Sequence, residues 1–353
     1  MGPTVLAPMY RSATVQRGPH VALDVLELWV RDLSRTEHLL TTTFGFEPLD
    51  ERLRSGPDEE VACVACGRVT VVLRQGTSPE SPIDRHVAVH GDTVGDLALL
   101  CGDAGGLVER ARAHGLDVSG EGDCRRIDLT GDGTICHSVR QNRLVSSQRE
   151  TLGAPRMQAV DHVTHCLSSG TAESVAKAYE EVFGLQRVDV GDLEQVGGDM
   201  TGMRSIVLRS PLGFTVVLTE PASPAGTGQT QRFIDAHAGP GVQHAAFAYD
   251  DLCAAVGALR SKGVNFLPAP GGYYEQSRER LSDVPLSWDA LQRLDILVDA
   301  DDDGLLFQLF TRPITDRGTF FIELIQRSGA SGFGANNVRA LFAAVDAAMR
   351  EGV

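Results

Sequence analysis

The chain has 353 residues, of which 42% are hydrophobic and 22% are charged, a balance that is typical of a soluble globular enzyme with room for two domains. This composition excludes an intrinsically disordered chain. The formal net charge of −15 argues against nucleic acid or an anionic membrane as a partner, because both require a basic surface that neutralises phosphate.

The N-terminal segment and the cysteines predict a cytoplasmic protein. Residues 1–17 lack the continuous apolar stretch of a secretory signal, and no later segment has the apolar length of a membrane span. The seven cysteines are scattered and odd in number, which favours a reducing compartment over a disulfide framework. Cys63 and Cys66 form one CxxC pair, which we interpret as core thiols because residues three apart in a strand face opposite sides.

In chain order, the first half predicts a strand around residues 23–25, a helix that ends near Phe44-Gly45, a strand that contains TVVL at residues 70–73, and a second helix at residues 107–114. The second half predicts the same series. It has a strand around residues 160–163, a helix that ends near Phe183-Gly184, TVVL again at residues 215–218, a strand near 241–247 and a helix at residues 252–262.

The two series form an internal repeat, most visible where GRVTVVLRQGTSP at residues 67–79 echoes GFTVVLTEPASP at residues 213–224. We therefore expect an α+β protein with two tandem homologous domains, at residues 18–150 and 155–353. Each domain is expected to form an open, barrel-like curved sheet around a central cavity, with its helices outside.

Glu323 is the most informative single residue, because it lies in an otherwise apolar strand within GTFFIELIQRSGASGFGANN at residues 318–337. A buried carboxylate is so costly that it must be paired, protonated or bound to a metal. His162 and His244 lie in similarly apolar strands. Two histidines and one carboxylate match the facial triad of non-haem Fe(II) oxygenases, so we predict a metal site in the second half.

Aligning the halves places Val25, Asp96 and Ser138 at the positions of these three residues, so the first half is predicted to bind no metal. The alternative is that the three are unrelated core polar residues; their equivalent strand positions in one repeat argue against it. His165 would face away from His162 in a strand.

The C-terminal segment predicts a helix that covers the cavity mouth and acts as a gate. Asn336 or Asn337 would cap it. Its apolar residues recur at helical spacing and would shield the site from water, beside a glycine-rich hinge at Gly329, Gly332 and Gly334. The alternative is a stripe that only packs a core; its members are Val338, Leu341, Phe342, Val345 and Met349.

Four runs carry a resemblance to a known family: VDHVTHCL at residues 160–167, GPGVQHAAF at 239–247, ILVDADDDGLLFQLFTRP at 296–313, and the run at 318–337. The second half resembles the 4-hydroxyphenylpyruvate dioxygenase family, which includes hydroxymandelate synthase and belongs to the vicinal-oxygen-chelate superfamily. A weaker match covers residues 20–145. The resemblance implies βαβββ repeats and a non-haem iron enzyme that uses Fe(II), O2 and an aromatic α-keto acid, as a homodimer or larger homo-oligomer.

The resemblance also implies residue roles. His162, His244 and Glu323 match the iron ligands, while Gln243 and Gln308 match catalytic glutamines beside the iron and the substrate. The remaining matches lie in the substrate pocket, where isolated polar residues bonded to backbone and phenylalanines packing a core are the alternative; they are Ser205, Thr219, Gln229, Phe310, Phe321, Phe333, Asn337 and Val338.

Three positions favour 4-hydroxymandelate as the product. The dioxygenases typically have Pro and Asn where this chain has Val217 and Thr219, and they have Phe where it has Val338. Losing that ring leaves room for the aromatic end of the substrate to move away, so the benzylic carbon becomes the target. Such an enzyme would supply hydroxyphenylglycine for an antibiotic. The alternatives are homogentisate formation, as in aromatic amino acid metabolism, and a metal-free binding or resistance module.

Overall fold

The computed structural model describes residues 20–350 except 51–52, 54–55, 121, 123, 146–155, 190–194, 198–200 and 282, and for residues 343–350 it describes the backbone only. The N-terminal segment on which the localisation was partly argued therefore lies outside the described residues, as do the side chains of Val345 and Met349 in the predicted stripe.

The first half forms one mixed sheet in the order β2-β3-β4-β1-β5-β8-β7-β6. Its strands are β1 (Val21–Trp29), β2 (Glu47–Pro48), β3 (Glu59–Cys66), β4 (Val69–Gly76), β5 (Thr93–Cys101), β6 (Asp117–Ser119), β7 (Arg125–Asp128) and β8 (Cys136–Arg140). Its helices are α1 (Leu33–Thr42), α2 (Pro82–His90) and α3 (Ala104–Ala113).

The second half forms a sheet in the order β10-β12-β13-β9-β14-β17-β16-β15, with β11 paired to β12. Its strands are β9 (Met157–Cys166), β10 (Gln186–Val188), β11 (Gln195–Val196), β12 (Met203–Arg209), β13 (Thr215–Pro221), β14 (Gly241–Tyr249), β15 (Leu297–Ala300), β16 (Leu305–Phe310) and β17 (Phe321–Ser328). Its helices are α4 (Ala172–Glu181), α5 (Gln229–His237), α6 (Leu252–Ser261), α7 (Tyr273–Arg280), α8 (Trp288–Arg293) and α9 (Ala335–Arg350).

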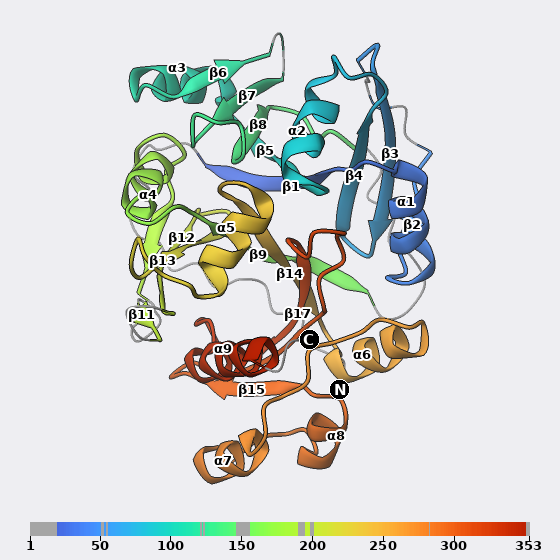
Figure 1. Cartoon of the computed structure of the whole chain (residues 1–353), viewed down its shortest axis with the longest axis vertical. Helices are drawn as coiled ribbons and strands as arrows, with labels where there is room; N and C mark the ends of the chain where they lie inside the picture. Colours follow the sequence, from blue (N-terminus) through green and yellow to red (C-terminus); the bar gives the residue numbers. More distant parts are fainter. Residues whose placement is uncertain are drawn as a thin grey trace, which may run out of the picture.

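Figure 1 shows two curved sheets with helices packed against them, which is the α+β fold that the sequence predicts. The helices that end at the two Phe-Gly pairs are α1 and α4, and the two later predicted helices are α3 and α6. The predicted division between the domains, at residues 150–155, falls in a segment outside the described residues.

The ladders align the halves in the register that the sequence predicts. Leu26 on β1 pairs with Val71 in the first TVVL, as Val163 on β9 pairs with Val216 in the second. Val25 therefore occupies the position of His162. The same comparison of β5 with β14 and of β8 with β17 places Asp96 at the position of His244 and Ser138 at that of Glu323.

The halves are joined by buried contacts. The turn between β3 and β4 lies on the start of β9, where Arg68 N donates to Met157 O at 2.8 Å. The hydroxyl of Tyr179 on α4 lies 2.7 Å from Nε2 of His137 and 3.2 Å from Nε2 of His165. One hydrophobic cluster contains residues of both halves, so they share a core.

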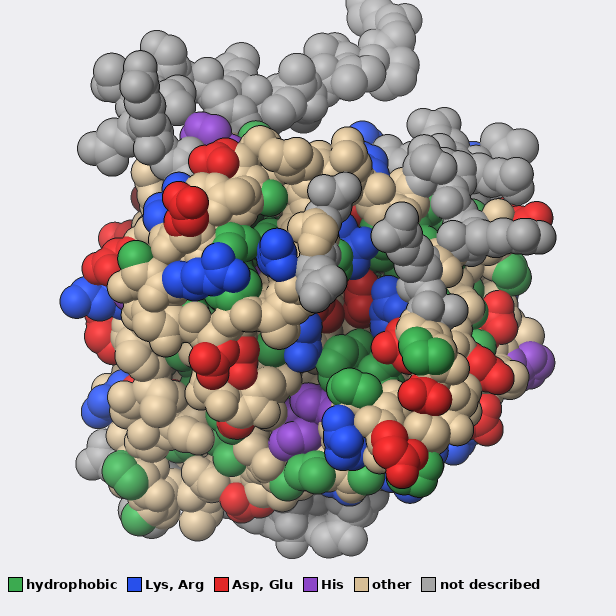
Figure 2. All heavy atoms as spheres, turned by 90° about the horizontal axis from the view of Figure 1, so that it is seen from above, with side chains coloured by type: hydrophobic (Ala, Val, Ile, Leu, Met, Phe, Trp, Pro, Cys, Tyr) green, Lys and Arg blue, Asp and Glu red, His purple; other side chains and the backbone are tan. Residues whose placement is uncertain are grey.

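The surface carries side chains of both charges. On the face seen in Figure 2, basic and acidic side chains are interspersed. Within the part of the chain that the structure describes, we find no helix long and apolar enough to cross a bilayer.

Candidate active site

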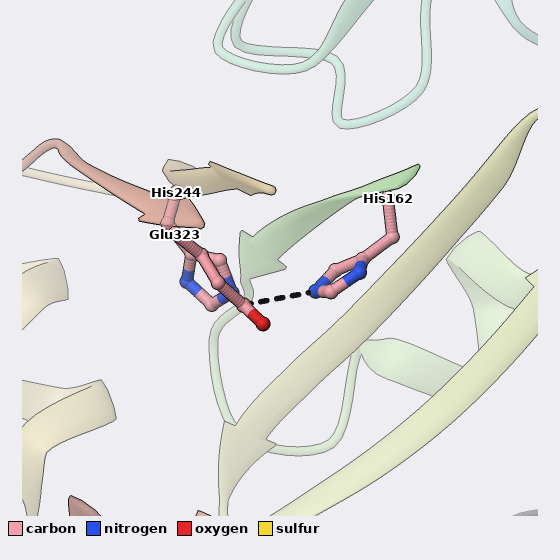
Figure 3. Close-up of side chains that lie close together, drawn as sticks. All are labelled: His162, His244 and Glu323. Carbon is pink, nitrogen blue, oxygen red and sulfur yellow. Dashed lines mark ion pairs between the residues drawn. The ribbon is translucent and has the colours of Figure 1, made fainter. Parts of the chain in front are cut away.

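Three adjacent strands bring His162, His244 and Glu323 together, from β9, β14 and β17 respectively. Each offers one ligand atom, and these atoms all lie within 4.8 Å of one another. Nε2 of His162 is 3.3 Å and Nε2 of His244 is 3.5 Å from the same oxygen, Oε2 of Glu323. Figure 3 shows the three side chains pointing toward one another. Two imidazole nitrogens and one carboxylate oxygen are a donor set that suits a divalent transition metal.

A β-bulge precedes each of the two histidines. On β9, Ala246 faces His162 and the next residue faces Val160, so Asp161 is the extra residue. On β14, Val242 faces His165 and His244 faces Thr164, so Gln243 is the extra residue. Bulges re-aim side chains next to functional sites. Here they bring the residue before each histidine within reach of its ring.

These bulged residues set the orientation of both imidazoles. Nδ1 of His162 donates to Oδ1 of Asp161 at 2.9 Å, and Nδ1 of His244 donates to Oε1 of Gln243 at 3.1 Å. Because each Nδ1 carries the proton, each neutral ring keeps its lone pair on Nε2, which faces Glu323. The residues present therefore fit a metal held by the two Nε2 atoms and the carboxylate.

The charges around His162 favour a cation at this place. Burial lowers the pKa of His162, but the Glu323 carboxylate and the hydrogen bond to Asp161 outweigh it and raise the pKa to about 9. Burial and the charge of His162 hold the pKa of His244 well below its usual value. Burial would raise the pKa of Asp161, but hydrogen bonds from Arg327 and His162 keep it well below the ordinary range.

Glu323 is fixed from behind by a buried chain of hydrogen bonds. Gln308 Nε2 donates to Glu323 Oε1 at 2.8 Å, which leaves Oε2 facing the histidines. Asn337 Nδ2 donates to Gln308 Oε1 at 2.8 Å, and Tyr273 OH donates to Asn337 Oδ1 at 2.6 Å. Both polar atoms of the Asn337 side chain are thus hydrogen-bonded within the protein, on the side of Gln308 away from Glu323. This differs from the prediction that it contacts the substrate.

A cavity of about 90 Å³ opens beside the three donors, and its lining is mainly apolar. Phe321 stacks on His244 with centroids 4.7 Å apart, and Phe333 meets the edge of His162 at 5.2 Å. The lining includes every pocket and glutamine residue predicted from the sequence except Asn337. It also includes Val217, which the sequence implicated in the choice of product, and Leu341, a member of the predicted gate. Three lining residues were not predicted; these are Thr164, Met203 and Val207.

The polar residues of the cavity differ in what they still offer. Thr219 Oγ1 donates to the carbonyl of His165 at 3.2 Å, so its hydroxyl proton is already used. Ser205 faces Thr219 across the ladder, and its hydroxyl has no hydrogen-bond partner among the described residues. Gln229 is the first residue of α5, and its amide lies 3.9 Å from the sulfur of Met203. Ser205 and Gln229 therefore keep polar groups for a ligand.

The start of α9 corrects the predicted helix cap. The helix begins at Ala335, so Asn336 and Asn337 lie within its first turn. The cap is Asp299 on β15, whose Oδ2 accepts from Asn336 N at 2.8 Å. The preceding glycines serve close packing: Gly334 has φ +68°, and a β-carbon there would collide with Gln308 Oε1.

His165 faces away from the donors, as predicted, and is fully buried against Tyr179. His137 and His237 are also fully buried, and each is hydrogen-bonded to the other half, His137 to Tyr179 at 2.7 Å and His237 to Thr93 at 3.1 Å. Sequence reasoning also missed Asp161 and Arg327 as partners of the site, although Asp161 directly precedes a predicted ligand.

Comparisons with known proteins agree with this geometry. Two family models, both described as "Glyoxalase/Bleomycin resistance protein/Dioxygenase superfamily", match this chain. One matches residues 159–309 and the other matches residues 25–131. A 4-hydroxyphenylpyruvate dioxygenase of Yarrowia lipolytica is 30% identical over 358 residues, which cover 92% of this chain and 91% of the relative. That of Sus scrofa is 29% identical, with 94% and 92% covered.

Among solved structures, a triple mutant of 4-hydroxymandelate synthase from Streptomyces coelicolor superposes with a TM-score of 0.81 at 33% identity. The superposition covers 94% of this chain and all of that one. The identity extends across both halves. The chain therefore belongs to the 4-hydroxyphenylpyruvate dioxygenase family, a family of non-haem iron dioxygenases that includes 4-hydroxymandelate synthase.

Proposed function

We propose that the chain uses Fe(II) and O2 to decarboxylate 4-hydroxyphenylpyruvate and hydroxylate its benzylic carbon, giving 4-hydroxymandelate and CO2. The observation that carries this proposal is the place of Val338, which lies in the cavity wall with Phe333 and Leu341. A phenylalanine, as expected in the dioxygenases, would fill this part of the cavity. With valine, the aromatic end of the substrate has room to lie away from the metal.

His162, His244 and Glu323 would hold the iron, and Asp161, Gln243 and Gln308 would keep their donor atoms aimed. When bound, iron supplies the redox chemistry that O2 activation requires, and three protein ligands leave coordination positions open for other ligands. The protein itself contributes orientation. Because Oε1 of Glu323 accepts from Gln308, Oε2 is the oxygen that would be free to hold the iron.

The rest of the cavity would bind and shield the substrate. Phe310, Phe321 and Phe333 form apolar walls that exclude water from the ring. Ser205 and Gln229 offer the polar groups that a phenol hydroxyl needs at the end of the cavity formed by β12 and α5. Helix α9 closes one side with Val338 and Leu341, and we propose that it acts as a gate.

A second candidate is 4-hydroxyphenylpyruvate dioxygenase, with homogentisate as the product. It is favoured by the 28–30% identity with several proteins of that name. The convergence of three donor atoms argues against a metal-free binding or resistance module. All seven cysteines are free, which supports the proposal of a cytoplasmic enzyme. We also propose a role in antibiotic biosynthesis, because 4-hydroxymandelate would supply hydroxyphenylglycine.

The test is a product assay with the purified full chain, Fe(II), O2 and 4-hydroxyphenylpyruvate, analysed by chromatography and mass spectrometry. We expect 4-hydroxymandelate as the main product. Homogentisate as the main product would assign the second candidate. Absence of CO2 release with iron bound would refute both.

A further inference from the structure

Arg327 contacts the metal-site partner Asp161 with two of its nitrogens. It lies on β17, four residues after Glu323. Its Nε donates to Asp161 Oδ2 at 2.7 Å and its Nη2 donates to Asp161 Oδ1 at 2.9 Å. The side chains are 21% and 13% exposed, so the pair is largely removed from solvent. A planar fork of this kind fixes both the position and the plane of the carboxylate.

The third nitrogen of the same guanidinium holds the loop before α9. Nη1 of Arg327 donates to the carbonyl of Gly332 at 2.6 Å and to that of Ala330 at 3.2 Å. The guanidinium carbon also lies 5.4 Å from the ring centroid of Phe333, the next residue of the loop. Phe333 in turn lines the cavity and meets the edge of His162.

We propose that Arg327 is a positioning residue that fixes the distance between the metal ligand His162 and the aromatic wall Phe333. The inference rests on the proposed function of these two residues. Asp161 transmits the first constraint, because it accepts from Nδ1 of His162 through the oxygen that also accepts from Arg327 Nη2. The loop carbonyls transmit the second. One rigid group thus holds a ligand and a cavity wall in register.

Lysine cannot replace this arrangement. Its ammonium is a point charge with three donors on a flexible stem, so it can neutralise Asp161 but cannot also hold the carboxylate plane and the loop. Arg327→Lys therefore separates charge from geometry. A role that needs only charge would survive this substitution.

The loop has a second attachment that does not involve Arg327. Oδ2 of Asp301 accepts from Ser331 N at 2.9 Å and from Gly332 N at 2.7 Å. Loss of Arg327 therefore loosens the loop without releasing it. Arg209 provides a matched control, because its guanidinium carbon lies 5.9 Å from the same Phe333 centroid while its Nε donates to Thr215.

The experiment measures Co(II) binding to the full chain by calorimetry and by the visible absorption of the bound ion, for wild type, Arg327→Met, Arg327→Lys and Arg209→Met. Both Arg327 variants should bind Co(II) about tenfold to a hundredfold more weakly, the range seen when partners of metal ligands are changed. Their Co(II) spectra should also shift. Arg209→Met should keep the wild-type affinity and spectrum.

Thermal unfolding verifies that each variant is folded. If an Arg327 variant does not fold, Asp161→Asn, which keeps the side-chain volume, replaces it in the experiment. Folded Arg327 variants with wild-type affinity and spectrum would overturn the inference, as would full rescue by lysine. Failure of the wild-type chain to bind Co(II) would instead overturn the proposed metal site. The Fe(II)-loaded Arg327 variants should also change the ratio of hydroxylated products, which Arg209→Met should not.

Discussion

The two halves hold different residues at the same three strand positions, within the same local backbone. The first half has the two bulges that precede the histidines in the second half; Asp24 and Gly95 lie where Asp161 and Gln243 lie in the second half. Yet its donor positions hold Val25, Asp96 and Ser138. The bulged backbone is therefore common to both sheets, and the metal-type donor set is not.

The difference lies in the source of positive charge. Asp96 accepts from Ser138 N at 2.8 Å and from Ser138 Oγ at 2.9 Å, and it pairs with Arg126 at 3.2 Å. Its neighbour Glu27 is paired with Arg74 at 2.7 Å. The first half thus neutralises its buried carboxylates with its own arginines. The second half presents Glu323 to two imidazole nitrogens, an arrangement that an added cation would complete.

The largest expected effect breaks the second half only. Glu323→Gln removes the one anionic ligand, so the chain should lose bound iron and turnover should fall by at least about a thousandfold, or ~4 kcal/mol in barrier. Asp96→Asn, the matched change in the first half, should leave the iron content unchanged. Metal analysis of both purified variants measures the iron content that tests this expectation. Iron retained by Glu323→Gln, or lost by Asp96→Asn, would contradict the assignment.

The next effect breaks the first half only. Arg126→Met leaves the buried Asp96 without its counter-charge, so the free energy of unfolding should fall by about 3–5 kcal/mol. Adding Asp96→Asn should recover part of this loss, because it removes the unpaired charge. Urea denaturation of the iron-free proteins measures both. If Arg126→Met is as stable as wild type, the ion network does not stabilise the first half.

A smaller effect tests the boundary between the halves. Burial lowers the pKa of His137, in the first half, and of His165, in the second, to about 3. Since an unfolded histidine titrates near 6.5, the unfolded state binds more protons between about pH 6.5 and 3. These two residues therefore make the unfolding free energy fall as the pH drops through that window.

His137→Asn should reduce the slope of stability against pH by up to one proton. The slope counts protons, so it is informative even if the variant is less stable at neutral pH. Urea midpoints between pH 4 and 7 measure it, and an unchanged slope would show that His137 does not titrate on unfolding.

The smallest expected effect concerns the cavity wall of the second half, which lies outside the three donor positions compared above. Val338→Phe should shift the product ratio toward homogentisate by about tenfold, because ~1.4 kcal/mol suffices for that factor. Arg339→Phe, which adds the same ring at the neighbouring exposed position of α9 outside the cavity lining, is the control and should leave the ratio unchanged. Equal shifts in both variants would mean that bulk alone, rather than position 338, decides the product.

The fold and the convergence of His162, His244 and Glu323 could be predicted from the sequence, because both depend on a repeated pattern. TVVL fixes the alignment of the halves, and the alignment then picks out His162, His244 and Glu323 as residues present in one half only. Helix α2 was missed although Ser81 and Pro82 carry a start signal, with Ser81 Oγ accepting from Ile83 N.

Residues whose role depends on long-range contacts were less predictable. Asn337 has the sequence position of a substrate or cap residue, but its partners Tyr273 and Gln308 lie 64 and 29 residues away. Arg327 likewise meets Asp161 across 166 residues. No local pattern encodes such partners, because the sheet topology brings them together.

The turn between β3 and β4 places Gly67 of the first half against the start of β9, the strand that carries His162. Gly67 has φ +59°, and a β-carbon there would collide with the carbonyl of Met157, the first residue of the strand that carries His162. Any side chain at position 67 would therefore displace the start of β9. In a genetic screen for loss of activity, Gly67→Ala should therefore appear among the active-site alleles, although position 67 lies in the half whose equivalent positions hold Val25, Asp96 and Ser138.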